Sequence, residues 1–202
     1  VEEKVKDTPE GEWILGRGWH QEKWDSIPLN NIHNYPMHDL LSAISPNNPV
    51  VLTHASGHSL FANKAAMEAS GVSKEMSSPL GGEIVRDRDG RAIGVFEERA
   101  MRIIRNILKE YQAGLSQEDL EAEWMSAVEL AQHECLSNGI TSFQDAGSKF
   151  VELTKYRQLA EEGKLDHRLW AMMRHSSKAM KGNVSKHRVI GAGNNFFPCR
   201  AI

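Results

Sequence analysis

The sequence predicts an α/β protein with an α+β appearance in isolation, because its two regions carry different patterns. In residues 139–173 a β-rich run, a helical segment and a second β-rich run follow one another, in about the length of one βαβ unit. Residues 1–115 instead mix short helices, short strands and a hairpin. We therefore expect an α+β region at 1–115, and a parallel α/β region at 116–202 that ends in an irregular tail.

The hairpin is the most distinct local feature of the first region. Residues 80–96 contain two alternating runs separated by Asp89-Gly90, a dipeptide that favours a two-residue type I′ turn with positive φ at both positions. Helical spacing of apolar residues, caps and stop signals predict the helices. Helices are expected at 37–45, 59–70, 97–112, 116–138 and 149–162. The strands of the βαβ unit are expected at 140–143 and 169–173.

Composition and charge favour a folded protein without a nucleic-acid or membrane partner. Of the 202 residues, 40% are hydrophobic and 25% charged, as in ordinary globular domains. The net charge is −3 and the basic residues are scattered, so no basic stripe indicates nucleic acid or an anionic membrane. No apolar run approaches the ~18 residues of a membrane span. The start is polar and acidic, unlike a signal peptide, and the distant Cys135 and Cys199 suggest no disulfide framework. These features predict a cytoplasmic location.

The histidines offer no clear metal site. His54 and His58 are four residues apart, but Gly57 interrupts them after a β-rich run, so a strand end and a loop are expected rather than one helical face. Ser56 beside His58 is rejected as a nucleophile–base pair, because near neighbours rarely face each other correctly and no Asp stands close by in sequence.

A second group of polar residues follows the strands of the βαβ unit. Asp145 comes directly after the first strand, and Arg174 and His175 come after the second. Because functional groups of parallel α/β folds collect at the C-terminal edge of the sheet, these side chains are candidates for a site. An alternative for Asp145 is equally open, namely that it caps the next helix or stabilises the turn.

Short segments along residues 11–173 also follow a recognisable order. They are GRGWHQ at 16–21, PVVL at 49–52, SGH at 56–58 with Asn63, GVFEERA at 94–100, and GITS at 139–142 followed by DAG at 145–147. In kind and order these segments resemble those of YtcJ-like metal-dependent amidohydrolases, the group that includes N-substituted formamide deformylase.

The resemblance implies a fold and a metal chemistry. That family has a (β/α)₈ barrel with an insertion after its first strand, so residues 1–115 would correspond to the insertion and 139–173 to the second and third barrel strands. The family's HxH metal motif would lie upstream of this chain, and its metal-bridging lysine would lie just downstream. The resemblance therefore implies a partial barrel and a fragment of a hydrolase of non-peptide, amide-type C–N bonds. The intact parent would use a divalent metal, with zinc as the expected ion.

For this chain alone, we expect no catalytic residue, no metal ligand set and no activity. We expect four residues of the family-like segments to line the substrate pocket of the intact protein: Trp19, His58, Asn63 and Asp145. A different hypothesis is a stand-alone, non-catalytic interaction domain. In either case an incomplete barrel would expose apolar strand residues, so a homo-oligomer, most simply a homodimer, is expected. The strand residues concerned are Ile140, Phe143, Leu169 and Ala171.

Overall fold

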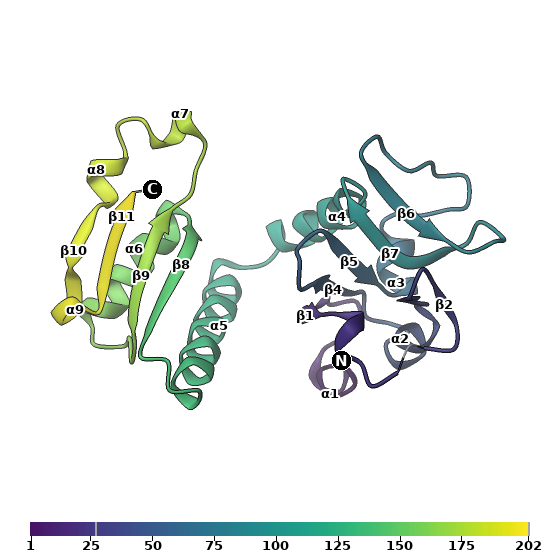
Figure 1. Ribbon diagram of the computed structural model, residues 1–202, viewed down its shortest axis with the longest axis horizontal. Helices are drawn as coiled ribbons and strands as arrows, with labels where there is room; N and C mark the ends of the chain where they lie inside the picture. Colours follow the sequence, from purple (N-terminus) through teal and green to yellow (C-terminus); the bar gives the residue numbers. More distant parts are fainter. Residues whose placement is uncertain (27, 202) are drawn as a thin grey trace. The chain divides into compact units, whose positions relative to one another are not determined.

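The computed structural model describes residues 1–26 and 28–201 and has a mixed α/β architecture (Figure 1). The chain forms two compact units, unit 1 (Val1–Leu115) and unit 2 (Ser116–Ile202). The expected α/β class is confirmed, and each unit has its own sheet and its own hydrophobic core.

Unit 1 is built on a five-stranded sheet with the strand order β1-β4-β5-β7-β6. Strand β1 runs parallel to β4, and the other neighbours are antiparallel. The strands are β1 (Ile14–Trp19), β4 (Val50–His54), β5 (Ser59–Ala62), β6 (Gly82–Arg86) and β7 (Ala92–Glu98). A separate small ribbon pairs β2 (Asn31–Ile32) with β3 (Tyr35–Pro36).

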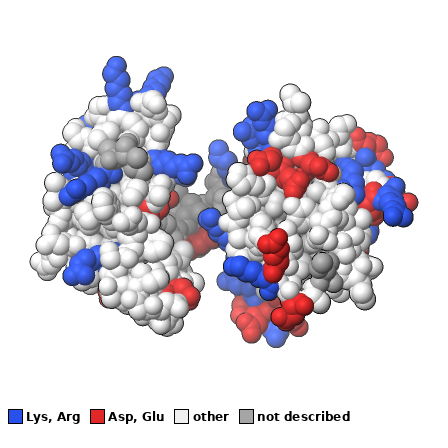
Figure 2. Space-filling view, in the orientation of Figure 1, with Lys and Arg blue, Asp and Glu red and all other residues white. Residues whose placement is uncertain are grey.

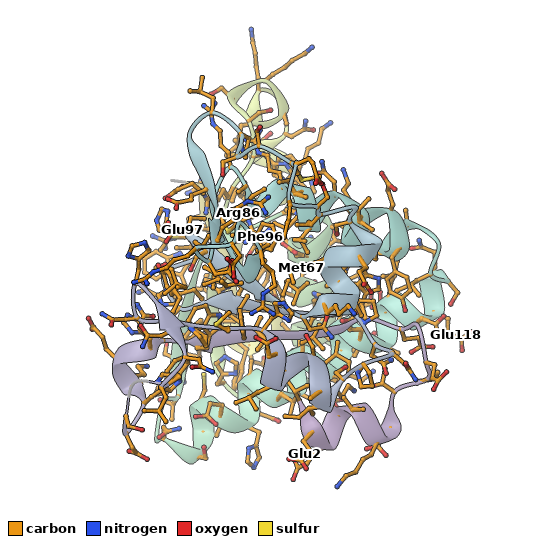
Figure 3. The ribbon with its side chains drawn as sticks, turned by 90° about the vertical axis from the view of Figure 1, so that its right-hand side faces the viewer. Glu2, Met67, Arg86, Phe96, Glu97 and Glu118 are labelled. Carbon is orange, nitrogen blue, oxygen red and sulfur yellow. The ribbon has the colours of Figure 1, made fainter. Side chains whose placement is uncertain are left out.

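Each face of this sheet has its own core, because successive strand residues point to opposite sides. On one face Leu60 and Phe96 pack with Met67 and Ile104 from the helices. Figure 3 labels Met67 and Phe96 within this core. On the other face Phe61 and other strand residues pack with Leu41. The helices of unit 1 are α1 (Glu2–Asp7), η1 (Gln21–Lys23), α2 (Asp39–Ile44), α3 (Lys64–Ala69) and α4 (Met101–Ala113).

The expected hairpin is present, but its turn differs from the expected type. Strands β6 and β7 pair antiparallel, and Asp87 N donates to the carbonyl oxygen of Arg91 at 2.9 Å. Three residues therefore lie between the last bonded positions, and only Gly90, not Asp89, has a positive φ. This is a three-residue loop rather than a type I′ turn. The Asp87 carboxylate accepts hydrogen bonds from Asp89 N and Arg91 N, and these bonds favour the longer loop.

Two expected helix starts in unit 1 were wrong, because strands occupy those residues. Residues 59–62 form β5, so the helix expected at 59–70 begins only at Lys64, with Asn63 as its N-cap. Similarly, β7 continues to Glu98, and α4 begins at Met101 rather than 97. In both places pairing with a neighbouring strand outweighs helical spacing.

Unit 2 contains a four-stranded sheet with the order β10-β11-β9-β8. Strands β8, β9 and β11 are parallel neighbours, whereas β10 is antiparallel to β11. The strands are β8 (Ser142–Ser148), β9 (Arg168–Met173), β10 (Val189–Gly191) and β11 (Phe197–Ala201). The helical segments are α5 (Gln117–Ser137), α6 (Phe150–Glu161), α7 (Ser177–Met180), α8 (Val184–His187) and α9 (Ala192–Asn195).

Helix residues bury one face of this sheet. Leu153 and Leu159 of α6 and Val128 of α5 pack with Leu169, Ala171 and Met173 of β9 and with strand residues of β11. Trp170, which points to the opposite face, is 36% exposed, and the guanidinium of Arg200 lies 5.7 Å from its ring centroid. Of the strand residues expected to lack cover, Ile140 and Phe143 are exposed, whereas Leu169 and Ala171 are buried in the core.

The C-terminal tail is more regular than expected. Residues 197–201 form β11, a third parallel strand beside β9. The side chains of Phe197 and Cys199 are fully buried, and burial raises the pKa of the Cys199 thiol to about 11. The alternation of these two apolar residues around Pro198 was the available sequence signal for this strand.

Candidate functional site

The polar residues Asp145, Arg174 and His175 lie at or near the C-terminal edge of β8 and β9. Asp145 does not follow β8 but lies inside it, opposite Ala171. From Asp145 to Ser148 the strand advances three residues while β9 advances two, from Ala171 to Met173, which makes a one-residue bulge. The Asp145 carboxylate accepts hydrogen bonds from Gly147 N at 3.2 Å and Ser148 Oγ at 2.6 Å and so closes the bulge.

The bulge in turn positions Arg174 at the end of β9. Arg174 N donates to the Ser148 carbonyl oxygen at 2.9 Å, which fixes the backbone of Arg174 against β8. Its side chain passes over Gly147, where an added Cβ would lie 3.4 Å from Arg174 Cδ. None of the seven ion pairs found among residues 1–26 and 28–201 includes Arg174. Arg174 as a whole is an exposed residue.

His175, the next residue, contacts the first turn of α6. Its Nε2 accepts a hydrogen bond from Phe150 N at 2.9 Å, so in the neutral ring the proton lies on Nδ1. The imidazole stacks on the Phe150 ring with centroids 3.9 Å apart, and His187 also stacks on this ring, at 4.3 Å. These contacts hold the segment that follows β9 against the start of α6.

A cavity of about 590 Å³ lies at this edge. Arg174, His175 and Ser177 provide its polar lining, and Met173 and Met180 belong to its apolar wall. The surrounding chain is strongly basic, since residues 167–202 contain seven Lys or Arg and no Asp or Glu: Arg168, Arg174, Lys178, Lys181, Lys186, Arg188 and Arg200. Figure 2 shows Lys and Arg side chains over the end of unit 2 that carries α7 and α8. Basic residues therefore outnumber acidic ones in this segment, although the chain as a whole has a net charge of −3.

Asp145, one of the four expected pocket residues, belongs to a different cavity of unit 2. This second cavity, of about 330 Å³, is lined mainly by apolar side chains, such as Phe143, and also by Tyr156 and His167. Burial, followed by the charges of Asp145 and Glu152, raises the pKa of Tyr156 to about 12. His167 is buried, its Nδ1 lacks a hydrogen-bond partner among the described residues, and burial lowers its pKa. The hydrogen bonds that the Asp145 carboxylate accepts from Gly147 and Ser148 favour the alternative role for Asp145, which is to stabilise the chain near the end of β8.

Trp19 and His58 lie in unit 1, in one connected set of contacts. Trp19 Nε1 donates to the Leu52 carbonyl oxygen at 2.9 Å, and its ring meets His54 edge-on at 4.7 Å. His54 Nδ1 and Ser56 Oγ are 2.8 Å apart, and Ser56 Oγ accepts a bond from His58 N. The Ser56 hydroxyl is therefore hydrogen-bonded to the imidazole of His54 and to the backbone of His58, not to the His58 imidazole.

The two histidines of this set have different environments. His54 is buried, and desolvation followed by the charge of His20 lowers its pKa. Its Nε2 lies 3.1 Å from Gln21 Oε1. His58 is exposed and pairs with Glu98, with Nδ1 and Oε1 2.9 Å apart. The contact between His54 and Gln21 could not be predicted from the sequence, because it depends on the β1–β4 pairing.

Asn63, the fourth expected pocket residue, is a structural residue. Its side chain is fully buried, and Oδ1 accepts hydrogen bonds from Val50 N at 2.9 Å and Ala66 N at 3.0 Å. Its Nδ2 donates to the carbonyl oxygens of Ser45 and Asn48 at 2.7 and 2.8 Å. All four hydrogen-bonding positions of the amide are therefore used, and none is left for a substrate.

The described residues do not fit a catalytic metal centre. Within residues 1–26 and 28–201, no three His, Cys, Asp or Glu side chains gather closely enough to hold an ion. Among the described residues, His20 and His54 meet through their rings, with centroids 4.6 Å apart. In the same part of the chain, no helix has the length and apolar character needed to cross a membrane.

Comparisons with known proteins identify the family. The profile of the amidohydrolase family matches residues 1–198. The chain is 24% identical over 182 residues to the putative amidohydrolase YtcJ of Bacillus subtilis, covering 88% of this chain and 32% of that protein. It is 30% identical over 168 residues to N-substituted formamide deformylase of Arthrobacter pascens, covering 82% of this chain and 29% of that protein.

A solved structure shares the fold. An uncharacterized metal-dependent hydrolase from Pyrococcus horikoshii OT3 matches 99% of this chain and 35% of its own, with a TM-score of 0.53 and 20% identity. The chain spans between about a quarter and a third of the curated relatives that it matches. The family-like segments, their order and the profile match agree, and the chain belongs to the amidohydrolase family.

Proposed function

We propose that this chain forms part of a metal-dependent hydrolase that cleaves a non-peptide, amide-type C–N bond. The observation that carries the proposal is the family match over residues 1–198. The formamide deformylase relative supports an amide-type substrate, and the Pyrococcus relative supports dependence on a metal. Both properties are proposals for this chain, which covers less than a third of that deformylase.

The fold proposal is that unit 2 supplies consecutive strands of a (β/α)₈ barrel. Strands β8, β9 and β11 are parallel neighbours in the sheet and follow that order along the chain, as barrel strands do, although the short β10 comes between β9 and β11 in sequence. The helices cover one face, and Trp170 and Arg200 lie on the other, which would face the barrel interior. The antiparallel β10 takes the position that a next barrel strand would need, so we infer that β10 moves when a longer sheet forms.

The metal in this proposal, with zinc as the expected ion, is held by residues outside this chain. The described residues offer no three-ligand group, and a catalytic zinc needs three protein ligands in fixed geometry. No step of the reaction is therefore assigned to this chain, and we expect the chain alone to be inactive. Its own residues would bind and orient the substrate at the C-terminal edge of β8 and β9. The free, buried Cys135 and Cys199 support a reducing compartment such as the cytoplasm.

A second candidate function is a non-catalytic interaction domain that forms homo-oligomers. The observation that favours it is exposed apolar side chains on both faces of the unit 2 sheet. Phe143, in register with Leu169 on the helix-covered face, is 46% exposed, and Trp170, on the opposite face, is 36% exposed. The strand β8 also forms an edge of its sheet, and an edge strand presents unpaired backbone groups.

The test separating the two functions compares this chain with a longer polypeptide from the same coding sequence. We expect an upstream HxH segment, a downstream lysine-bearing strand, and metal-dependent turnover of N-acyl or N-formyl amines by the longer protein only. Coding sequence that lacks both segments would contradict the hydrolase proposal. A self-contained oligomer without turnover would then support the interaction domain.

A further inference from the structure

We propose that the cavity at the C-terminal edge of β8 and β9 binds a carboxylate group of the substrate, with Arg174 as the carboxylate-binding residue. This inference rests on the proposed hydrolase function and narrows its substrate class to amides that also carry a carboxylate beside an apolar chain. The inferred carboxylate site does not depend on where the metal is bound.

Arg174 is held in place but its charge is not neutralised within the described chain. Its backbone is fixed by the bond to Ser148, and the bulge that Asp145 closes sets the position of Ser148. Other arginines of the protein do have partners, for example Arg91 with Asp39 and Asp87. Because a guanidinium fork matches a planar carboxylate in two parallel hydrogen bonds, an Arg without a partner at a cavity is suited to that anion.

The remaining cavity lining fits the same ligand. His175 has its neutral-ring proton on Nδ1 because Nε2 accepts the Phe150 N–H, and Ser177 adds a hydroxyl. Met173, Met180 and Val184 form an apolar wall. A cavity lined by both polar donors and apolar side chains favours a small amphipathic anion.

The local charge also favours an anion. Residues 174–186, which border the cavity, hold Arg174, Lys178, Lys181 and Lys186 and no acidic residue. The carboxylates of Asp145 and Glu152, on the neighbouring β8 and α6, are directed to hydrogen bonds with groups of their own elements. Asp145 accepts bonds from Gly147 and Ser148, and Glu152 accepts a bond from Lys149 N. A carboxylate entering the cavity would therefore meet a positive local field.

The experiment measures binding to the 202-residue chain by calorimetry or NMR titration, without metal or turnover. The probes are N-formylmethionine, its carboxamide, and inorganic phosphate, all at the same ionic strength. The variants are Arg174→Gln, Arg174→Lys and, as a matched control, Arg168→Gln. Arg168 is an exposed arginine at the other end of β9, with its guanidinium 5.6 Å from the Phe196 ring centroid.

We expect the acid to bind about tenfold or more tightly than the carboxamide, the ratio typical of a charge-assisted hydrogen bond. Arg174→Gln should abolish this preference, Arg174→Lys should retain part of it, and Arg168→Gln should leave it unchanged. Equal binding of acid and carboxamide, equal loss in both glutamine variants, or a phosphate response as strong as that of the acid would overturn the proposal. Because no turnover is read, failure of the hydrolase proposal would appear separately, in the longer protein.

Discussion

Asn63 shows how a residue in a family-like segment can serve the fold rather than the substrate. The sequence places it after the SGH segment, but the partners of its amide come from residues 45, 48, 50 and 66. Sequence spacing cannot show that these backbone groups converge, because the convergence depends on β4 and β5 lying side by side. Asp145 is similar, since its position near the sheet edge was predictable but the bulge that uses its carboxylate was not.

Replacing Asn63 with Ala should destabilise unit 1 by at least about 3 kcal/mol. The change removes a helix N-cap and leaves buried backbone groups unpaired, at about 1–3 kcal/mol for each group. Urea unfolding followed by tryptophan fluorescence measures the effect. Asn47→Ala is the control, because the Asn47 amide makes only an exposed bond to Glu10, and its cost should stay under about 1 kcal/mol. Equal midpoints for the two variants would contradict the structural role of Asn63.

Tyr156 should titrate near pH 12 in the folded protein, because burial and the nearby Asp145 and Glu152 disfavour the phenolate. The raised pKa means that its contribution to stability is present below the ordinary pKa of 10.0 and is lost as the pH rises through about 12. Ultraviolet difference absorbance follows the titration, and Tyr156→Phe identifies the transition. Glu152→Gln should lower the pKa of Tyr156. A Tyr156 transition near 10 in the native protein would show that the hydroxyl is not buried as described.

At the scale of elements, the hairpin was predictable and its details were not. Asp-Gly between alternating runs indicates a hairpin from local sequence alone. The loop length depends on the Asp87 carboxylate, and the end of β7 depends on pairing with β5. The βαβ unit was likewise predictable from spacing, whereas the short β11 was missed because two alternating residues in a Gly- and Asn-rich tail give a weak signal.

Two glycines of this hairpin test how closely β7 packs. Both Gly90 and Gly94 have positive φ, so alanine at either position costs about 1–2 kcal/mol of backbone strain. At Gly94 an added Cβ would also lie 2.5 Å from the Ala62 carbonyl oxygen and 2.9 Å from His38 Cβ, whereas at Gly90 it meets open space. We therefore expect Gly94→Ala to cost about 1–3 kcal/mol more than Gly90→Ala. Chemical denaturation of both variants measures the difference, and equal losses would contradict the close approach of β5 and α2 to Gly94.

At the scale of the whole molecule, we predict a homodimer or larger assembly at micromolar concentration. Burying Phe143, or Trp170 on the opposite face of the sheet, in an interface is worth about 1.5–3 kcal/mol for each fully buried large side chain. Phe143→Asp should weaken the assembly, whereas Leu29→Asp, at an isolated exposed position of unit 1, should not. Sedimentation would contradict the prediction if the unchanged chain ran as a monomer of 22.6 kDa.

The family was predictable because several short segments occur in a fixed order, although no single one is diagnostic. The shape of the site was not, because Arg174 meets Ser148 only through the pairing of β8 with β9, and His175 meets Phe150 only through the docking of α6. Long-range pairing of this kind leaves no local signature in the chain.

We propose that this chain belongs to a metal-dependent amidohydrolase but does not itself hold the metal. The most direct measurement is the metal content of the purified 202-residue chain, together with its turnover of N-acyl and N-formyl amines after addition of zinc, manganese or cobalt. We predict substoichiometric metal and no metal-dependent turnover, because the described residues form no three-ligand group. Near-stoichiometric metal with metal-dependent turnover, abolished by His54→Ala or His58→Ala, would contradict the account and show that the chain has a metal site of its own.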